Sequence, residues 1–133
     1  MIKPAEISVR YSDLDVMGHV NNSVYLTYFE MARVHYFGNF LGRDWDWKKD
    51  GIILVKNEIE YLKPVFLHDR PKIEVFTSHI GTKSFVLDYR VTVGDKLCAT
   101  GSSTLVAFDS EKNTTVVISE GMKAMLVSLK KEQ

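Results

Sequence analysis

The clearest pattern in the sequence is a helical one in the first third of the chain. Two apolar stripes at spacings of three and four lie side by side: Tyr25, Phe29, Ala32, Tyr36 and Phe40 in one, and Val24, Tyr28, Met31 and His35 in the other. Two stripes make a wide apolar surface, so we expect a helix that is buried on more than one side. Asn21, Asn22 and Ser23 are candidate N-caps, and Gly42 is the expected stop.

Most of the remaining chain alternates apolar and β-branched residues with polar ones, which is typical of strands. One short strand is expected before the helix, at residues 7–11. After the helix, strands are expected at residues 52–62, 71–80, 84–93, 96–109 and 114–117. A closing helix is expected from Ser119 through Leu129, although Gly121 weakens its first turn. This order predicts an α+β fold, in one domain over residues 1–133.

Composition and charge narrow the class of protein. The chain has 17 Lys+Arg and 17 Asp+Glu, so no global field attracts nucleic acid, and we expect no nucleic-acid partner. No apolar run approaches the ~20 residues that a membrane span needs. The single cysteine, Cys98, lies in an expected strand and is interpreted as a buried structural thiol. The lone cysteine and the absence of a secretory h-region favour a cytoplasmic location.

Candidate chemistry gathers just ahead of the long helix. Asp15 comes shortly before the expected helix N-terminus, where backbone N–H groups are unpaired and carry partial positive charge. A carboxylate base or nucleophile beside such donors is a minimal set of groups for acyl transfer.

The same region carries a recognisable signature, Asp13-x-Asp15-x-x-Gly18-His19-Val20-Asn21-Asn22-x-x-Tyr25-x-x-Tyr28-Phe29-Glu30-x-Ala32-Arg33. It resembles hotdog-fold acyl-CoA thioesterases of the 4-hydroxybenzoyl-CoA thioesterase family. The resemblance implies a hotdog fold, in which a curved antiparallel sheet wraps around a long central helix. It further implies a homodimer or homotetramer with active sites at the subunit interface. The implied substrate is an acyl-CoA, with acyl carrier protein as the alternative thiol carrier.

The resemblance also assigns roles to residues. Asp15 corresponds to the catalytic carboxylate, and the backbone N–H of Asn22 corresponds to the donor to the thioester carbonyl. Whether Asp15 attacks the carbonyl or deprotonates a water stays open. Apart from the resemblance, Gly18, His19 and Tyr25 are further candidates for substrate binding. Their alternatives are a simple turn glycine, a structural hydrogen bond and a plain core position, respectively.

Lys83 and Ser84 lie at an expected hairpin tip and correspond to a region near the pantetheine arm and phosphates of coenzyme A. Coenzyme A belongs to the substrate, so no bound cofactor is expected. The remaining histidines are scattered and no cysteine cluster lies near them, so no catalytic metal is expected either.

Several alternatives remain open at this point. Asp13 is expected to make local turn hydrogen bonds rather than to act chemically. Glu30 is a rival acid on the helix, although pairing with Arg33 is the favoured interpretation. The same fold could instead serve as a non-catalytic acyl-CoA binding module. A hydratase or dehydratase would need a proton-transfer pair, for which only Asp15 and His19 are available.

Overall fold

The computed structural model describes residues 1–131 and divides the chain into two compact units. The first unit consists of Met1–Tyr36, Ile59–Val75 and Tyr89–Gly101. The second unit consists of Phe37–Glu58, Phe76–Asp88 and the described part of Ser102–Gln133. Each boundary falls inside a helix or a strand, so these elements pass from one unit into the other. The single domain over residues 1–133 therefore stays a prediction, and residues 132–133 lie outside the described part.

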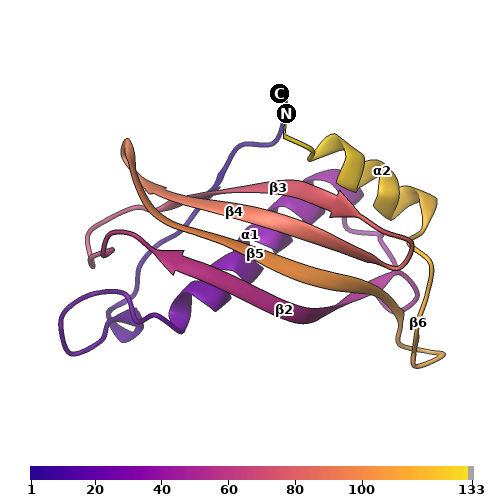
Figure 1. Ribbon diagram of the computed structural model, residues 1–133, viewed down its shortest axis with the longest axis horizontal. Helices are drawn as coiled ribbons and strands as arrows, with labels where there is room; N and C mark the ends of the chain where they lie inside the picture. The colour runs from indigo at the N-terminus through magenta and orange to yellow at the C-terminus, as the bar shows by residue number, and fades with distance from the viewer. Residues whose placement is uncertain (132–133) are drawn as a thin grey trace. The chain divides into compact units, whose positions relative to one another are not determined.

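The element order is that of an α+β protein (Figure 1). The helices are the 3-10 turn η1 Tyr11–Asp13, α1 Val24–Leu41 and α2 Glu120–Ser128. The strands are β1 Ala5–Glu6, β2 Gly51–Tyr61, β3 Lys72–Ile80, β4 Ser84–Val93, β5 Lys96–Asp109 and β6 Thr114–Thr115. These bounds confirm the long helix, the closing helix and the strands expected after the long helix. The expected strand at 7–11 is wrong, because strand pairing is confined to β1 and the extended stretch after it ends in η1 at Tyr11.

The strands form one sheet in the order β1-β3-β4-β5-β2, with β6 paired to β5. Hairpins join β3 to β4 and β4 to β5, and the arrows of β2 and β5 run in opposite directions (Figure 1). The outer side of β3 pairs with β1 at Ile73 and Lys72, and with Lys130 at Thr77. On the other side, β2 ends the strand order, and no further strand of residues 1–131 pairs with its outer edge.

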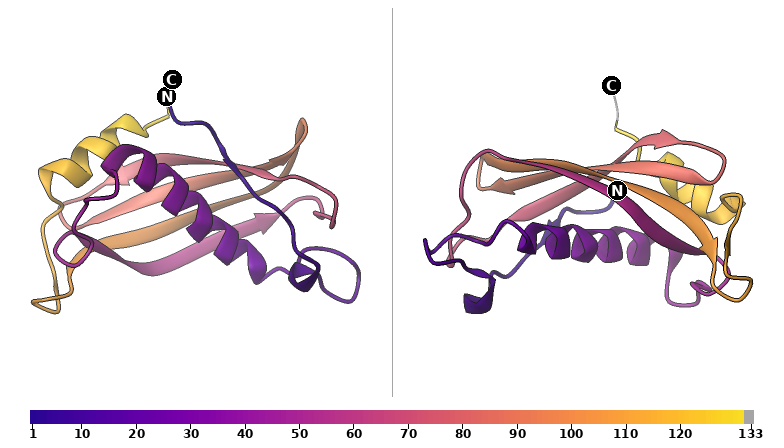
Figure 2. Two further views of the ribbon diagram at one scale, coloured as in Figure 1. Left: turned by 180° about the vertical axis from the view of Figure 1, so that it is seen from behind. Right: turned by 60° about the horizontal axis from the view of Figure 1, so that its bottom comes forward.

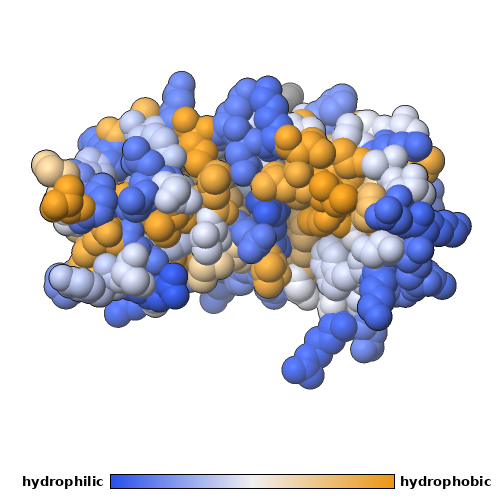
Figure 3. Space-filling model, turned by 90° about the horizontal axis from the view of Figure 1, so that it is seen from below, coloured by the Kyte–Doolittle hydropathy of each residue, from blue (hydrophilic) through white to orange (hydrophobic). Residues whose placement is uncertain are grey.

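Apolar side chains on β2 add to this open edge. Ile53, Leu54 and Val55 are 40%, 41% and 57% exposed, and all three lie in the first half of this long strand. Figure 3 shows apolar residues interspersed with hydrophilic ones on the face of the molecule seen from below. An exposed apolar edge strand favours association, in line with the expected homo-oligomer, which stays a prediction.

The helix α1 begins and ends where the sequence predicts. It starts at Val24, directly after the polar run, and it ends at Leu41. Gly42 follows with a φ of 79°, a left-handed conformation that glycine adopts without a steric cost. The N–H of Gly42 donates to the C=O of Gly38, which closes the last turn.

Within the first unit, the N-terminal part of α1 packs on one face of the strand segments (Figure 2). The rings of Phe29 and Tyr89 stack at a centroid distance of 4.1 Å with an interplanar angle of 3°. Phe29 is 0% exposed and Tyr89 is 1% exposed. Arg33, one turn further along α1, donates to the Tyr89 hydroxyl at 3.0 Å, so this tyrosine is held by both packing and a hydrogen bond.

Within the second unit, α2 is capped by Ser119, whose hydroxyl accepts from the N–H of Met122 at 3.2 Å. Gly121 lies against the ring of Trp45, and a Cβ at this position would come within 2.9 Å of ring atoms. The glycine that weakens the first turn of α2 therefore allows close packing. Neither helix in the described residues has the length and apolar character that a membrane span needs.

Replacing Phe29 by alanine should lower the free energy of unfolding by about 3–5 kcal/mol, because it removes a fully buried ring from the stack with Tyr89. Urea unfolding at a fixed protein concentration measures the change. Met31→Ala is the matched control on the same helix, since Met31 is 46% exposed and should change stability by about 0.5 kcal/mol or less. Equal effects of the two changes would contradict this account of the core.

Candidate active site

The segment between η1 and α1 folds into a narrow hairpin. The N–H of Asn21 donates to the C=O of Asp13 at 2.8 Å, and the N–H of Asp15 donates to the C=O of His19 at 2.7 Å. Gly18 closes the tip with a φ of 79°, and its N–H donates to the C=O of Asp15 at 3.0 Å. The predicted turn glycine is therefore required for the backbone here, and the hairpin fixes Asp15 near the entry of α1.

The Asp15 carboxylate is partly exposed, and only one of its two oxygens accepts hydrogen bonds from the protein. Its Oδ1 accepts from the N–H of Met17 at 2.9 Å and from the N–H of His19 at 3.2 Å. Its Oδ2 has no hydrogen-bond partner among the residues that the structure describes. One oxygen thus anchors the carboxylate to its loop, and the other remains available to a ligand.

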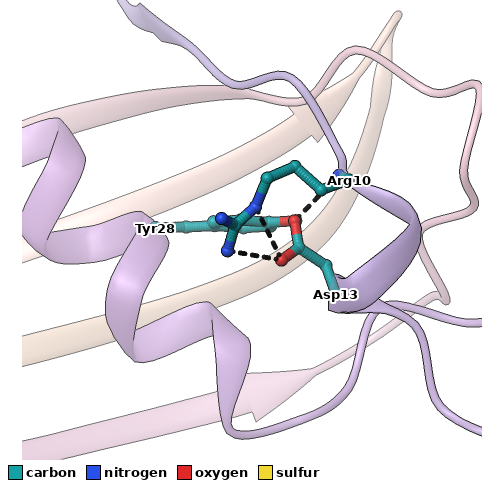
Figure 4. A network of polar contacts seen from close by, with 3 residues as sticks. All are labelled: Arg10, Asp13 and Tyr28. Atoms are coloured by element: carbon teal, nitrogen blue, oxygen red, sulfur yellow. Dashed lines mark hydrogen bonds and ion pairs between the residues drawn. The ribbon is translucent and has the colours of Figure 1, made fainter.

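Asp13 has the opposite environment, as Figure 4 shows. It is 2% exposed, and its Oδ2 accepts from the Tyr28 hydroxyl at 2.7 Å and from the Arg10 N–H at 2.9 Å. The Arg10 guanidinium pairs with Oδ1 at 3.1 Å. The expectation of local turn hydrogen bonds holds for Arg10, but the bond to Tyr28 reaches 15 residues along the chain into α1.

The network sets the ionisation of Asp13. Burial is the largest single influence and disfavours the carboxylate, but the hydrogen bonds from Arg10 and Tyr28 together outweigh it and lower the pKa of Asp13. Burial and the same carboxylate raise the pKa of Tyr28, which therefore stays a donor. Asp13 is ionised, satisfied and structural, and Asp15 is left as the carboxylate with a free oxygen.

The entry of α1 presents an unbonded main-chain donor. Asn21 Oδ1 accepts from the N–H of Ser23 at 3.0 Å and from its hydroxyl at 2.9 Å, and the C=O of Asn21 accepts from the N–H of Val24. Asn22 makes a hydrogen bond through its C=O, which accepts from the Tyr61 hydroxyl at 2.8 Å. In residues 1–131, nothing accepts from the N–H of Asn22.

Asp15 and Asn22 thus belong to the same hairpin-and-helix segment, Asp15 with an unbonded carboxylate oxygen and Asn22 with an unbonded main-chain N–H. Both are accessible in part to solvent, Asn22 more than Asp15. No acidic side chain lies in the first turn of α1 to neutralise the positive end of its dipole. The segment therefore offers two kinds of group that carbonyl chemistry uses, a carboxylate oxygen and a main-chain donor at a helix N-terminus.

The ring of His19 does not pair with the Asp15 carboxylate in the described structure. It packs edge-on against Phe66 at a centroid distance of 5.1 Å, and the hydrogen bond that joins His19 to the carboxylate comes from its backbone N–H. Val20 continues this support, since its N–H donates to the C=O of Val65 at 2.8 Å. His19 therefore serves the geometry of the hairpin, and the acid–histidine pair that a hydratase would need is not formed.

Tyr25 lies near the start of the helix and is 3% exposed. Its ring meets the Tyr61 ring edge-on at a centroid distance of 5.0 Å. Burial, with Cys98 and Tyr61 nearby, raises the pKa of Tyr25 to about 12, so the phenol is neutral at ordinary pH. The ring is placed close to the helix entry, as an acyl-pocket residue would be, but no contact tests that role.

Glu30 and Cys98, the other candidate reactive groups, both have structural surroundings. The Glu30 side chain is 71% exposed and pairs with Arg33 at 3.9 Å, in line with the favoured interpretation. Cys98 is buried, and burial raises the pKa of its thiol, as suits a structural cysteine. Lys83 and Ser84 form the β3–β4 hairpin tip in the second unit, and their coenzyme A role stays a prediction.

Arg10 and Tyr61 also shape this site, and neither is among the candidate residues named from the sequence. Arg10 stands three residues before Asp13, which is a readable local signal for a capping pair. Tyr61 is 39 residues from Asn22 in the sequence, and nothing in a local pattern connects them.

Comparisons with known proteins settle the family. The family model of the thioesterase-like superfamily matches residues 9–126. This chain belongs to the thioesterase-like superfamily. The uncharacterized protein YsmA of Bacillus subtilis is 30% identical over 128 residues, which are 92% of this chain and 83% of that protein. The match confirms the relationship to thioesterases that the signature around Asp15 indicates, and membership of the narrower 4-hydroxybenzoyl-CoA thioesterase family stays a prediction.

Solved structures give the fold. A thioesterase of Thermus thermophilus, crystallised with coenzyme A and Zn, is 30% identical with a TM-score of 0.83 over 98% of this chain and 96% of its own. The 1,4-dihydroxy-2-naphthoyl-CoA thioesterase Slr0204 of Synechocystis has a TM-score of 0.84 over 98% of each chain, and at 16% identity it shows the fold alone. The predicted α+β hotdog fold is thus confirmed, and thioester hydrolysis is supported as the general activity.

No group of three or more His, Cys, Asp or Glu residues that could hold a metal ion occurs in the described part of the chain. The absence of a catalytic metal and of a bound cofactor stays a prediction.

Replacing Tyr28 by phenylalanine should lower the free energy of unfolding at pH 7 by roughly 1.5–3 kcal/mol, because a buried carboxylate loses a donor. The folded pKa of Asp13 is lowered from 3.8, so this stabilisation is present above that pH and is lost as the pH falls through the folded pKa. The difference between the unmodified chain and Tyr28→Phe should therefore shrink below pH 3.8.

Urea unfolding at a series of pH values measures that difference. Tyr11→Phe is the control, because Tyr11 is 82% exposed. A difference that stays constant from neutral to acid pH would contradict the assignment of Asp13 as the partner.

Proposed function

We propose that this protein is an acyl-CoA thioesterase. Water cleaves the C–S bond of the thioester, the acyl carbon takes the oxygen as a free acid, and coenzyme A leaves as the thiol. The observation that carries the proposal is the pair of open atoms at the entry of α1, Asp15 Oδ2 and the N–H of Asn22. The family and the coenzyme A complex of the Thermus thermophilus thioesterase support the substrate class.

Asp15 supplies the negative charge for the reaction. Its free oxygen either removes a proton from the attacking water or attacks the carbonyl carbon to form a mixed anhydride that water then opens. The hydrogen bonds to Oδ1 from Met17 and His19 keep the carboxylate from rotating away. The partial exposure of Asp15 leaves room for a water or a substrate beside it.

The N–H of Asn22 polarises the thioester carbonyl and stabilises the oxyanion that forms on it. The unneutralised N-terminus of α1 adds partial positive charge at the same place. On this account Gly18 lets the hairpin turn close to the substrate, and Tyr25 lines the acyl side. A role of Lys83 and Ser84 toward the coenzyme A arm is a separate proposal, because they belong to the second unit. Acyl carrier protein is the alternative carrier of the thiol.

Asp15→Asn should lower the rate of thiol release from acyl-CoA substrates by roughly 10²–10⁴-fold, because the amide neither takes a proton nor attacks. Glu30→Gln is the matched control on the rival acid, and its rate should stay near that of the unmodified chain. A panel of acyl-CoAs with a thiol-reactive dye gives both rates. Full activity in Asp15→Asn, or a selective loss in Glu30→Gln, would overturn the assignment of the acid.

The same panel separates the other functions of this fold. Tight acyl-CoA binding with no thiol release by the unmodified chain would indicate a non-catalytic binding module. Addition of water to an enoyl-CoA without thiol release would indicate a hydratase.

Asn22→Pro should lower the rate of thiol release by roughly 10²–10³-fold, because it removes the N–H that donates to the carbonyl. That N–H has no acceptor in the described protein, so no internal hydrogen bond is lost with it. Asn22→Ala keeps the N–H, so its rate of thiol release should fall far less. Equal losses in the two variants would place the role in the side chain instead, and activity retained in the folded proline variant would exclude this donor.

A further inference from the structure

The strand β2 ends in a residue that reaches the entry of α1. Tyr61 donates from its hydroxyl to the C=O of Asn22 at 2.8 Å, and both residues belong to the first unit. The bond joins the last residue of β2 to the turn that presents the N–H of Asn22. This contact is the one long-range hydrogen bond of Asn22 in the described chain.

The end of β2 is itself firmly held. The N–H groups of Leu62 and Lys63 both donate to the C=O of Cys98 on β5, at 2.8 and 3.0 Å. The Tyr61 ring rests edge-on against the buried ring of Tyr25, at a centroid distance of 5.0 Å. Tyr61 is 45% exposed, so its position depends on the bonded backbone beside it and on the ring contact with Tyr25. Neither of these involves the hydroxyl, which is left to donate to Asn22.

The peptide group between Asn22 and Ser23 is clamped at both ends. Its C=O accepts from Tyr61, and its N–H donates to Asn21 Oδ1 at 3.0 Å. The preceding peptide group has its C=O bonded to the N–H of Val24 and its N–H free. Holding the Asn22–Ser23 peptide group limits rotation about the backbone bonds of Asn22, which join it to the preceding peptide group. The N–H of Asn22 is therefore held in one direction.

Building on the proposed function, we infer that Tyr61 is a positioning residue for the reaction. Its hydroxyl holds the Asn22–Ser23 peptide group so that the N–H of Asn22 keeps the direction needed at the thioester carbonyl. It acts through Asn22 and does not take part in the chemistry itself. A donor that is free to tilt loses much of its value, since small misplacements of reacting groups are costly in rate.

The test is Tyr61→Phe, which removes the hydroxyl and keeps the ring against Tyr25. The expected result is a roughly tenfold to hundredfold lower kcat for acyl-CoA hydrolysis, with KM and Tm near those of the unmodified chain. Tyr11→Phe is the matched control, because Tyr11 is 82% exposed and stands outside the proposed site. A higher KM with unchanged kcat would overturn the inference, since it would make Tyr61 a substrate contact.

A double-mutant cycle distinguishes action through Asn22 from a general structural role, because it measures whether the two losses of kcat are additive. If Tyr61 acts through the N–H of Asn22, Tyr61→Phe should cause no further loss of kcat when added to Asn22→Pro. Full additivity of the two losses would overturn the inference. Loss in Asn22→Pro with none in Tyr61→Phe would also overturn it, while leaving the proposed function intact. No loss in Asn22→Pro would instead remove the proposed donor.

Discussion

The hydrogen bond from Tyr28 to Asp13 is the interaction on which the arrangement of the site depends. At 2.7 Å it joins a buried carboxylate in η1 to the second turn of α1. The Arg10 guanidinium pairs with the other oxygen of Asp13, so the charge of the buried carboxylate is compensated. Because the C=O of Asp13 in turn accepts from Asn21, this anchor fixes the hairpin that carries Asp15 relative to the helix entry that carries Asn22.

Two aspartates that are two residues apart thereby acquire different roles. Asp13 uses both oxygens in bonds to the protein, whereas Asp15 uses one and keeps the other open. The entry of α1 shows the same division, since Asn21 satisfies Ser23 and Val24 while the N–H of Asn22 is left free. A site that must bind a substrate needs polar atoms that the fold itself does not satisfy, and the hairpin and the helix entry provide one each.

The sequence predicts the fold correctly where a long periodic pattern distinguishes a helix from a strand. The stripes through Tyr25 and Phe29 predict α1, and Gly42 marks its end. The short segment at 7–11 was beyond such reasoning, because alternation over five residues does not distinguish a strand from an extended stretch before a 3-10 turn. For the candidate site, the sequence indicates Asp15 and the helix entry, and their catalytic role stays a prediction. The contacts of Tyr28 and Tyr61 depend on tertiary structure, which no local spacing reveals.

The central claim is that a thioester carbonyl binds at the entry of α1, between the carboxylate of Asp15 and the N–H of Asn22. The most direct measurement is a crystal structure of the protein with an acyl-CoA analogue in which a methylene group replaces the sulfur. The account predicts that the analogue's carbonyl oxygen accepts from the N–H of Asn22 and that Asp15 faces its carbonyl carbon. An analogue whose carbonyl lies away from both groups would contradict it.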